Sequence, residues 1–124
     1  VDRARTPWLV VYFHTSYYHS YVAQYMQGNT FRTVYEPLLH QHGADLVFSG
    51  HTHAYERTFP IFNYSRDSCG PIYITIGEQV HRRPAAGGVL RQPPAWSAFR
   101  EQSFGFGLLE LLNDTHAVWQ WNRN

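Results

Sequence analysis

The stretch that most constrains the fold lies at residues 47–57, where a short apolar run leads directly into Gly50-His51-Thr52-His53. The β-branched and aromatic residues of the run predict a buried strand, and Gly50 predicts a tight turn at its end. Residues i and i+2 of an extended backbone point to the same side, so both imidazoles can face one metal ion or two neighbouring ions. Two histidines that fall close together by chance on a polar loop are the alternative. The apolar strand before them favours metal binding.

A third histidine follows another strand of the same kind. Residues 8–13 form a continuous apolar run, which predicts a strand buried on both faces, and His14 comes directly after it. Residues 29–43 have helical spacing, so the order is strand, helix, strand. A right-handed crossover makes the two strands parallel, and their carboxyl ends then meet at one edge of the sheet. We therefore expect His14, His51 and His53 to converge there, although each one alone could be a structural histidine.

The predicted helix has one apolar face, whose spacing runs through Phe31, Val34, Tyr35, Leu38, Leu39 and His42. Asn29 or Thr30 is expected to cap the helix and Gly43 to end it. Pro37 should kink the helix or restart it as a first-turn residue. We interpret His40 and His42 as surface or packing residues rather than ligands.

The second half of the chain predicts further strands and a long loop. Residues 72–76 are strongly β-prone, and residues 104–112 and 117–122 predict a hairpin whose tryptophans pack against the sheet. Residues 78–96 have no periodicity and predict a long loop. Its arginines, Arg82, Arg83 and Arg91, could contact an anionic substrate, but a solvated basic loop is the preferred interpretation.

The composition places the chain among globular proteins and argues against several other classes. Its 124 residues are enough for one domain with a core. A hydrophobic content of 44% argues against disorder, and a net charge of +1 with scattered arginines argues against nucleic-acid binding. No apolar run is long enough to predict a membrane span.

Three smaller features predict a longer protein of the secretory pathway. The sequons at Asn63 and Asn113 fall where turns are expected and predict glycosylation of a secreted protein. The single cysteine, Cys69, has no partner in the chain, so a disulfide would need a longer chain or a second subunit. The chain begins at Val1 without an initiator methionine, which suggests a piece of a longer protein.

These motifs together resemble a known family. The resemblance covers nearly the whole chain, in the family's order, and is specific because it includes both Val-x-x-His and Gly-His-x-His. The segments that carry it are Thr6-Pro7-Trp8 through His14, Tyr35-Glu36-Pro37-Leu38, Gly50 through Arg57, Pro71 through Gly77, Ser97-Ala98-Phe99-Arg100-Glu101 with Ser103-Phe104-Gly105, and Trp121-Asn122-Arg123-Asn124. They resemble the C-terminal half of plant-type purple acid phosphatases, which are calcineurin-like metallophosphoesterases.

The resemblance implies an α/β fold, half of a four-layer α-β-β-α sandwich with a mixed sheet, a βαβ unit and a C-terminal hairpin. Residues 1–124 would be the C-terminal part of the catalytic domain. It also implies a dinuclear centre of Fe(III) with Zn, Mn or Fe(II), in which His14 and His51 hold the divalent ion and His53 the ferric ion. The implied activity is hydrolysis of small phosphate monoesters by a secreted, cell-wall or vacuolar protein, and the longer protein could be a homodimer.

The chain departs from the family pattern at several positions. The family's remaining ligands lie in Asp-x-Gly, Gly-Asp-x-x-Tyr and Gly-Asn-His motifs, none of which occurs here. Ala23 and Gln24 stand where the family has histidines that contact phosphate and protonate the leaving group, and His19 is a weak substitute nearby. The loop usually written Gly-Asp-x-Gly-Asn reads Gly77-Glu78-Gln79-Val80-His81, and Phe106 replaces another histidine.

Two other functions therefore stay open. The chain could be a non-catalytic fragment or binding module with an incomplete metal site. Its three histidines could also bind a single Zn or Cu ion without phosphatase chemistry.

Overall fold

The computed structural model describes residues 1–77, 87–103 and 105–123, and these contain one helix and nine strands. The elements in chain order are β1 (Val10–Phe13), α1 (Asn29–Gln41), β2 (Leu46–Ser49), β3 (Tyr55–Thr58), β4 (Ile61–Phe62), β5 (Ser65–Arg66), β6 (Ile72–Ile76), β7 (Ser97–Glu101), β8 (Gly105–Leu111) and β9 (Ala117–Arg123). Within these described ranges no helix is long and apolar enough to cross a membrane.

Five of the strands form one mixed sheet in the order β1-β2-β6-β3-β7. The strands β1, β2 and β6 are parallel, whereas β3 pairs antiparallel with both β6 and β7. The predicted βαβ unit is confirmed, because β1, α1 and β2 follow one another and Phe13 lies opposite Ser49 in the register. The carboxyl ends of β1 and β2 therefore meet at one edge of the sheet.

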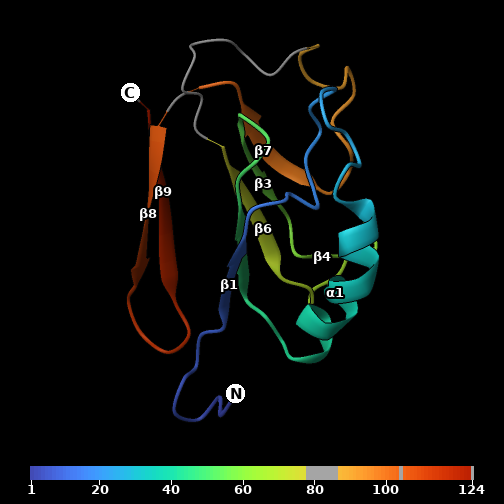
Figure 1. Cartoon of the computed structure of the whole chain (residues 1–124). Coiled ribbons are helices and arrows are strands. Elements are labelled where there is room, and N and C mark those ends of the chain that lie inside the picture. Colours follow the sequence, from blue (N-terminus) through green and yellow to red (C-terminus); the bar gives the residue numbers. More distant parts are fainter. Residues whose placement is uncertain (78–86, 104, 124) are drawn as a thin grey trace.

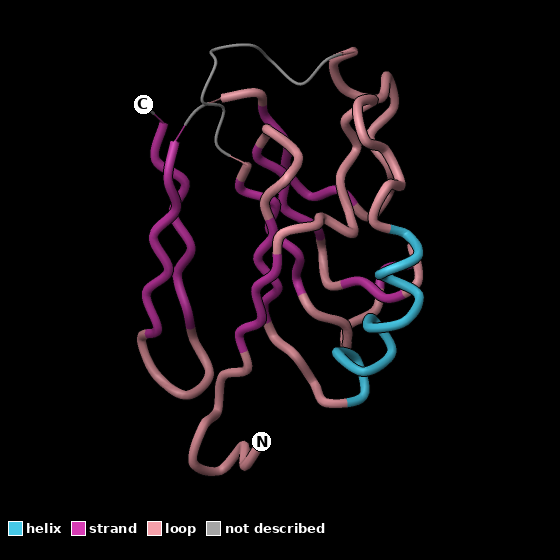
Figure 2. The backbone as a smooth tube through the Cα atoms, in the orientation of Figure 1, coloured by secondary structure: helices cyan, strands magenta, loops and turns pink. Residues whose placement is uncertain are grey.

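The helix and the C-terminal hairpin lie on opposite faces of this sheet, as Figures 1 and 2 show. The hairpin of β8 and β9 packs through its tryptophans: Trp121 stacks on Tyr55 with ring centroids 4.4 Å apart, and Trp119 Nε1 donates a hydrogen bond to the Tyr55 hydroxyl at 2.8 Å. The layer order of helix, mixed sheet and hairpin confirms the predicted fold class.

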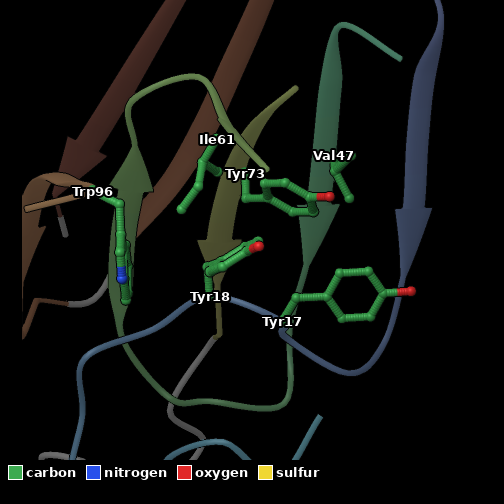
Figure 3. Packing of buried hydrophobic residues seen from close by; sticks show 6 residues of the cluster. All are labelled: Tyr17, Tyr18, Val47, Ile61, Tyr73 and Trp96. Atoms are coloured by element: carbon green, nitrogen blue, oxygen red, sulfur yellow. The ribbon is translucent and has the colours of Figure 1, made fainter. Parts of the chain in front are cut away.

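The core lies between the sheet and the helix and is built largely from aromatic rings (Figure 3). Its buried cluster combines side chains from the loop after β1, from the five-stranded sheet, from β4 and from the segment before β7, namely Tyr17, Tyr18, Val47, Ile61, Tyr73 and Trp96. The ring of Tyr18 makes edge contacts with Tyr73 at 4.8 Å and with Trp96 at 5.5 Å. Each such pair adds roughly 0.5–1.5 kcal/mol beyond its buried area. The loop after β1 is thus part of the core.

The prediction for the buried face of α1 was wrong for most of its members, although Leu39 does pack against the core. Phe31, Val34 and Leu38 are 39%, 59% and 48% exposed, and the buried residues of the helix are Arg32 and Glu36. These two charges can be buried because they pair with each other and because Glu36 also accepts a hydrogen bond from the Tyr18 hydroxyl. Helical spacing alone could not find a buried face made of paired charges.

The ends of α1 also differ in part from expectation. Gly28 occupies the N-cap position and neither Asn29 nor Thr30 caps the helix through its side chain. Pro37 lies inside one continuous helix instead of restarting it. Gly43 follows the C-cap with φ of 63°, the left-handed conformation that makes glycine a helix terminator, as predicted.

The prediction that the first strand is buried on both faces was also wrong. Strand β1 begins at Val10 and lies at the edge of the sheet, and its Tyr12 side chain is 85% exposed. Val11 and Phe13 point the other way and pack against the core. A continuous apolar run cannot show whether both faces find partners within 124 residues.

The predicted strands of the second half of the chain are present, and further strands accompany them. Strand β6 and the β8–β9 hairpin are confirmed, whereas β7 and the short strands β3, β4 and β5 form where no strand was predicted. Of the predicted loop at residues 78–96, positions 78–86 lie outside the described residues, and with them Arg82, Arg83 and the Glu78-to-His81 segment. Arg91 is exposed.

Candidate metal centre

Two of the predicted ligands meet at the carboxyl edge of the sheet. His14 follows β1, His51 lies in the turn after β2, and His14 Nε2 is 3.0 Å from His51 Nδ1. The strand ends are tied together by the Gly50 N–H, which donates to the His14 carbonyl at 3.0 Å. Two imidazole nitrogens that each bind one ion at about 2.1 Å are about 3.0–3.4 Å apart. The observed spacing therefore suits two ligands of the same ion.

The turn that carries His51 holds an uncommon backbone conformation. His51 has φ of 62°, in the left-handed region that costs a residue with a side chain about 1 kcal/mol or more. Three hydrogen bonds keep it there: Thr52 N–H donates to Gly50 O at 2.7 Å, Ala54 N–H to Thr52 O at 2.8 Å, and the Ser16 hydroxyl to Gly50 O at 2.6 Å. The surroundings thus fix the turn, and the turn aims the His51 ring at His14.

Close packing against Gly77 holds the same turn from the other side. A Cβ atom at position 77 would lie 1.8 Å from Thr52 O, so only glycine lets the end of β6 approach this closely. The Gly77 N–H donates to Ala54 O at 3.1 Å. The predicted tight turn is therefore confirmed, but the glycine that packs most closely against its neighbours is Gly77 and not Gly50.

All three predicted histidines line one open cavity of about 320 Å³. The complete lining is His14, Gln24, Gly50, His51, His53, Ile76 and Gly77. His14 and His53 are exposed and His51 is half-buried, so the cavity that they line is open to solvent. The structure thus brings the three histidines to one cavity, as the strand order predicted.

Gln27 contacts the far side of the His51 ring. Its Oε1 lies 3.1 Å from His51 Nε2, a distance suited to a hydrogen bond from a protonated Nε2. In that tautomer the lone pair of His51 is on Nδ1 and points toward His14. An outer partner of this kind fixes the tautomer and orientation of a metal-binding histidine. Sequence reasoning missed Gln27, because a glutamine outside any apolar pattern carries no signal.

The donor set fits part of a metal centre. Neutral imidazoles bind zinc and iron, which agrees with the expected ions. Within residues 1–77, 87–103 and 105–123, however, no group of three or more His, Cys, Asp or Glu side chains is close enough to hold one ion. The single-ion site of three histidines therefore has no support here, and the His14–His51 pair needs further ligands.

His19 does not reach this cavity. Its side chain is buried, with 3% exposed, and its Nε2 lies 3.0 Å from the Gln24 carbonyl. Burial lowers the pKa of His19 from its ordinary 6.5, so at a given pH a smaller fraction of the rings carries the extra proton that a leaving group would need. The residue that lines the cavity is instead Gln24, whose backbone has φ of 65°, while Ala23 is half-buried and does not line it.

Comparisons with known proteins agree with this geometry. Residues 2–55 match the family described as calcineurin-like phosphoesterase, and residues 70–124 match the family described as iron/zinc purple acid phosphatase-like protein C. Purple acid phosphatase 18 of Arabidopsis thaliana is 49% identical to the chain over all of its 124 residues. The chain belongs to the purple acid phosphatase family. It spans 28% of the length of that relative.

Two further relatives show how far the similarity in sequence and in structure extends. The Fe(3+)-Zn(2+) purple acid phosphatase 12 of Arabidopsis thaliana is 44% identical over the whole chain, which spans 29% of it. The solved purple acid phosphatase PPD1 from yellow lupin seeds superimposes with a TM-score of 0.78 at 24% identity, over 99% of this chain and 24% of that one. The lupin structure supports the fold, and the Arabidopsis sequences support the family.

Proposed function

We propose that this chain is the C-terminal part of a metal-dependent phosphatase that hydrolyses small phosphate monoesters through a dinuclear centre. The observation that carries the proposal is the 3.0 Å approach of His14 Nε2 to His51 Nδ1, in a cavity that His53 also lines. Residues 1–124 are then one section of a catalytic domain whose remainder belongs to the longer protein. One relative is named an Fe(3+)-Zn(2+) purple acid phosphatase, which supports iron paired with zinc, and Mn or Fe(II) are the other candidate divalent ions.

Each histidine has a proposed role. His14 and His51 would hold the divalent ion together, and His53 would hold the ferric ion. When bound, such a pair of ions acidifies a water molecule and neutralises the charge that develops on the phosphate, so no nucleophilic side chain is needed. The chain itself positions the imidazoles through the Gly50–His51 turn and orients His51 through Gln27.

The rest of the site would come from the additional length that the relatives have. The described part of the chain gathers no third ligand for the His14–His51 pair. It also exposes large apolar side chains that a longer protein would cover, including Tyr12 at 85%, Phe106 at 61% and Val34 at 59%. We therefore propose that these 124 residues alone have little or no phosphatase activity.

The leaving-group side of the site differs from the family pattern. Gln24 lines the cavity and can donate or accept a hydrogen bond, but an amide cannot protonate a leaving group. Phe106, the other replaced position, is exposed on the hairpin. We propose that Gln24 contacts the phosphate ester without acting as an acid.

The sequons support a secreted or vacuolar glycoprotein. Asn63 and Asn113 are both exposed, and Asn63 begins a two-residue turn between β4 and β5 with φ of 46°. Such turns are accessible to a glycosylating enzyme. Cys69 is exposed as well, so a homodimer bridged through it is sterically open in the longer protein.

The proposal is tested on the longer protein, purified and analysed for metal and for hydrolysis of an aryl phosphate at acidic pH. We expect about two metal ions per chain and turnover that His53→Ala abolishes. His42→Ala is the matched control, because His42 is exposed at the end of α1, away from the cavity. Activity unchanged in His53→Ala, or strong turnover by residues 1–124 alone, would refute the proposal.

A further inference from the structure

A row of polar side chains crosses the sheet one layer below the histidines. In the strand register Ser49 of β2 lies opposite Thr75 of β6, Thr75 lies opposite Glu56 of β3, and Glu56 lies opposite Arg100 of β7. Partners in a register share a face, so all four side chains lie on the face that Tyr73 and Val47 also line, toward the core. Ser49, Thr75 and Glu56 are buried. A polar row in such a place requires partners.

The loop after His14 supplies those partners at every second residue. The Ser16 hydroxyl is 3.2 Å from that of Ser49 and 3.3 Å from that of Thr75, and the Tyr18 carbonyl is 3.3 Å from the Thr75 hydroxyl. Ser20 then reaches Glu56. The loop is therefore bonded across the strands in the order in which the sheet presents them.

Glu56 is the most heavily bonded member of the row. It is fully buried, and its carboxylate accepts from the Ser20 N–H at 2.6 Å, the Ser20 hydroxyl at 2.9 Å and the Ser97 hydroxyl at 2.6 Å. Arg100 donates to the Ser20 hydroxyl at 2.8 Å and to the Leu90 carbonyl at 2.9 Å. Burial raises the pKa of Glu56 from its ordinary value, and the hydrogen bonds from Ser97 and Ser20 and the charge of Arg100 oppose that rise. Loss of the side chain would leave these buried donors unpaired.

The loop that Glu56 holds forms a wall of the cavity. Beyond Ser20 the chain is joined to residues 87–90, where Val22 N–H donates to Gly88 O at 2.9 Å and Leu90 N–H donates to Ser20 O at 2.8 Å. It then presents Gln24 to the cavity and Gln27 to His51. Glu56 itself lies three residues after His53, so one carboxylate links the loop that follows His14 to the strand that follows the His51–His53 turn.

We infer that Glu56 is a positioning residue, which fixes the loop at residues 15–27 so that Gln24 and Gln27 stand at the phosphate-binding cavity. The inference rests on the proposed function for the identity of the ligand, but not for the loop contacts. Glu56 acts through Ser20 and lies below the cavity lining, so it is not itself a group that touches substrate.

The experiment compares Glu56→Ala with Glu56→Gln in the longer protein, because glutamine keeps one acceptor and nearly the same volume. Amide hydrogen exchange measured by mass spectrometry should show peptides within residues 15–27 exchanging at least about tenfold faster in Glu56→Ala, with partial recovery in Glu56→Gln. With metal in excess, the dissociation constant for inorganic phosphate should rise about tenfold in Glu56→Ala.

Thr58→Val is the matched control, since Thr58 is equally buried on β3 but its hydroxyl accepts from the Tyr73 N–H of the neighbouring strand. It should lower the melting temperature and speed exchange in β6 without changing the exchange of residues 15–27 or phosphate binding. If Glu56→Ala lowers the melting temperature but leaves both the exchange of residues 15–27 and phosphate binding unchanged, the role is merely structural and the inference is wrong. If no phosphate binds to the wild type, the proposed function fails, and the exchange arm alone confirms or refutes the positioning of the loop.

Discussion

The carboxyl edge of the sheet and the side-chain layer directly beneath it are built in opposite ways. At the edge, His14 and His53 are exposed, and the described residues offer the His14–His51 pair no third ligand. In the layer below, Ser49, Thr75 and Glu56 are buried, and each has hydrogen-bond partners. The chain therefore contains a complete scaffold for an incomplete site. Substitutions at the edge should change metal and phosphate binding, whereas most of those in the interior should change stability.

The largest effect is expected at the edge itself, from His51→Ala in the longer protein. His51 is a proposed metal ligand that lines the cavity and lies in the strained turn. Its loss should lower phosphatase turnover about 1,000-fold or more and reduce the metal content. Metal analysis and an aryl phosphate assay measure both. Because alanine also tolerates the turn poorly, His51→Asn serves as a second variant that favours the same backbone region. Wild-type metal content in both variants would contradict the comparison.

In the interior the largest expected effect is on stability. Glu36→Gln removes the charge opposite buried Arg32 and weakens the bond from the Tyr18 hydroxyl, so the free energy of unfolding should fall by about 3 kcal/mol. Urea denaturation of the metal-free longer protein measures it. The exposed carboxylate variant Glu110→Gln is the control and should change stability by less than about 0.5 kcal/mol. Equal losses of unfolding free energy in the two variants would show that the buried Arg32–Glu36 pair stabilises the fold no more than an exposed carboxylate does.

An intermediate effect is expected from Gln27→Ala, which leaves the His51 ring without its outer partner. Metal affinity should fall about 10- to 100-fold, as for other outer partners of metal-binding histidines, with little change in the unfolding free energy. Isothermal titration with zinc tests the affinity. Gln41→Ala, an exposed glutamine at the end of α1, should have no effect on zinc binding. A large loss of unfolding free energy in Gln27→Ala would contradict the proposed difference between the edge and the interior.

His19 should make stability depend on pH. Burial holds the pKa of His19 below 6.5, so on acidification the unfolded chain binds a proton that the folded chain resists. The contribution of His19 is therefore zero well above pH 6.5, and it lowers stability below that pH by up to about 1.4 kcal/mol per pH unit. His19→Gln should become more stable relative to wild type as the pH falls from 7 to 5.5. A stability difference that does not change with pH would contradict this.

The smallest effect is expected in the hairpin turn, far from both regions. Asn113 Oδ1 accepts bonds from the Thr115 N–H at 2.9 Å, the Thr115 hydroxyl at 3.0 Å and the His116 N–H at 2.9 Å. Asn113→Ala should cost about 1 kcal/mol of unfolding free energy and leave metal binding unchanged. Asn113→Asp keeps the acceptor while it removes the sequon, so it separates the turn from glycosylation. A loss of glycan mass in both variants would identify Asn113 as modified.

Most of the strand framework could be predicted because it depends on local pattern. The apolar runs before His14 and His51 and the helical spacing between them were sufficient to place both histidines at one edge. Which strands pair with one another was harder to predict. Strand β7 has only one apolar residue with strong strand preference, Phe99, and forms because β3 offers it a partner.

The residues of the site also fall into two groups, those that the local sequence pattern indicated and those that only the three-dimensional contacts revealed. A metal-binding role for the three histidines was predicted from residue type and position, and both this role and the ligand assignments stay predictions. The buried charges Arg32, Glu36 and Glu56 were not predicted as interior residues, because isolated charges belong on surfaces and only the three-dimensional contacts show that these are paired. Gln24 was named from the sequence only as a replacement, and its place in the cavity lining required the structure.

The edge position of β1 has a practical consequence for anyone who produces these 124 residues alone. Among the strands that the structure describes, β1 pairs only with β2, so the other side of its backbone presents unpaired N–H and C=O groups beside the exposed Tyr12 ring. An exposed edge of this kind can pair with a strand of another molecule, including a second copy of this chain, and so promotes aggregation. The same edge would also let a separately expressed piece with a free strand pair beside β1, which is the principle of split-protein complementation.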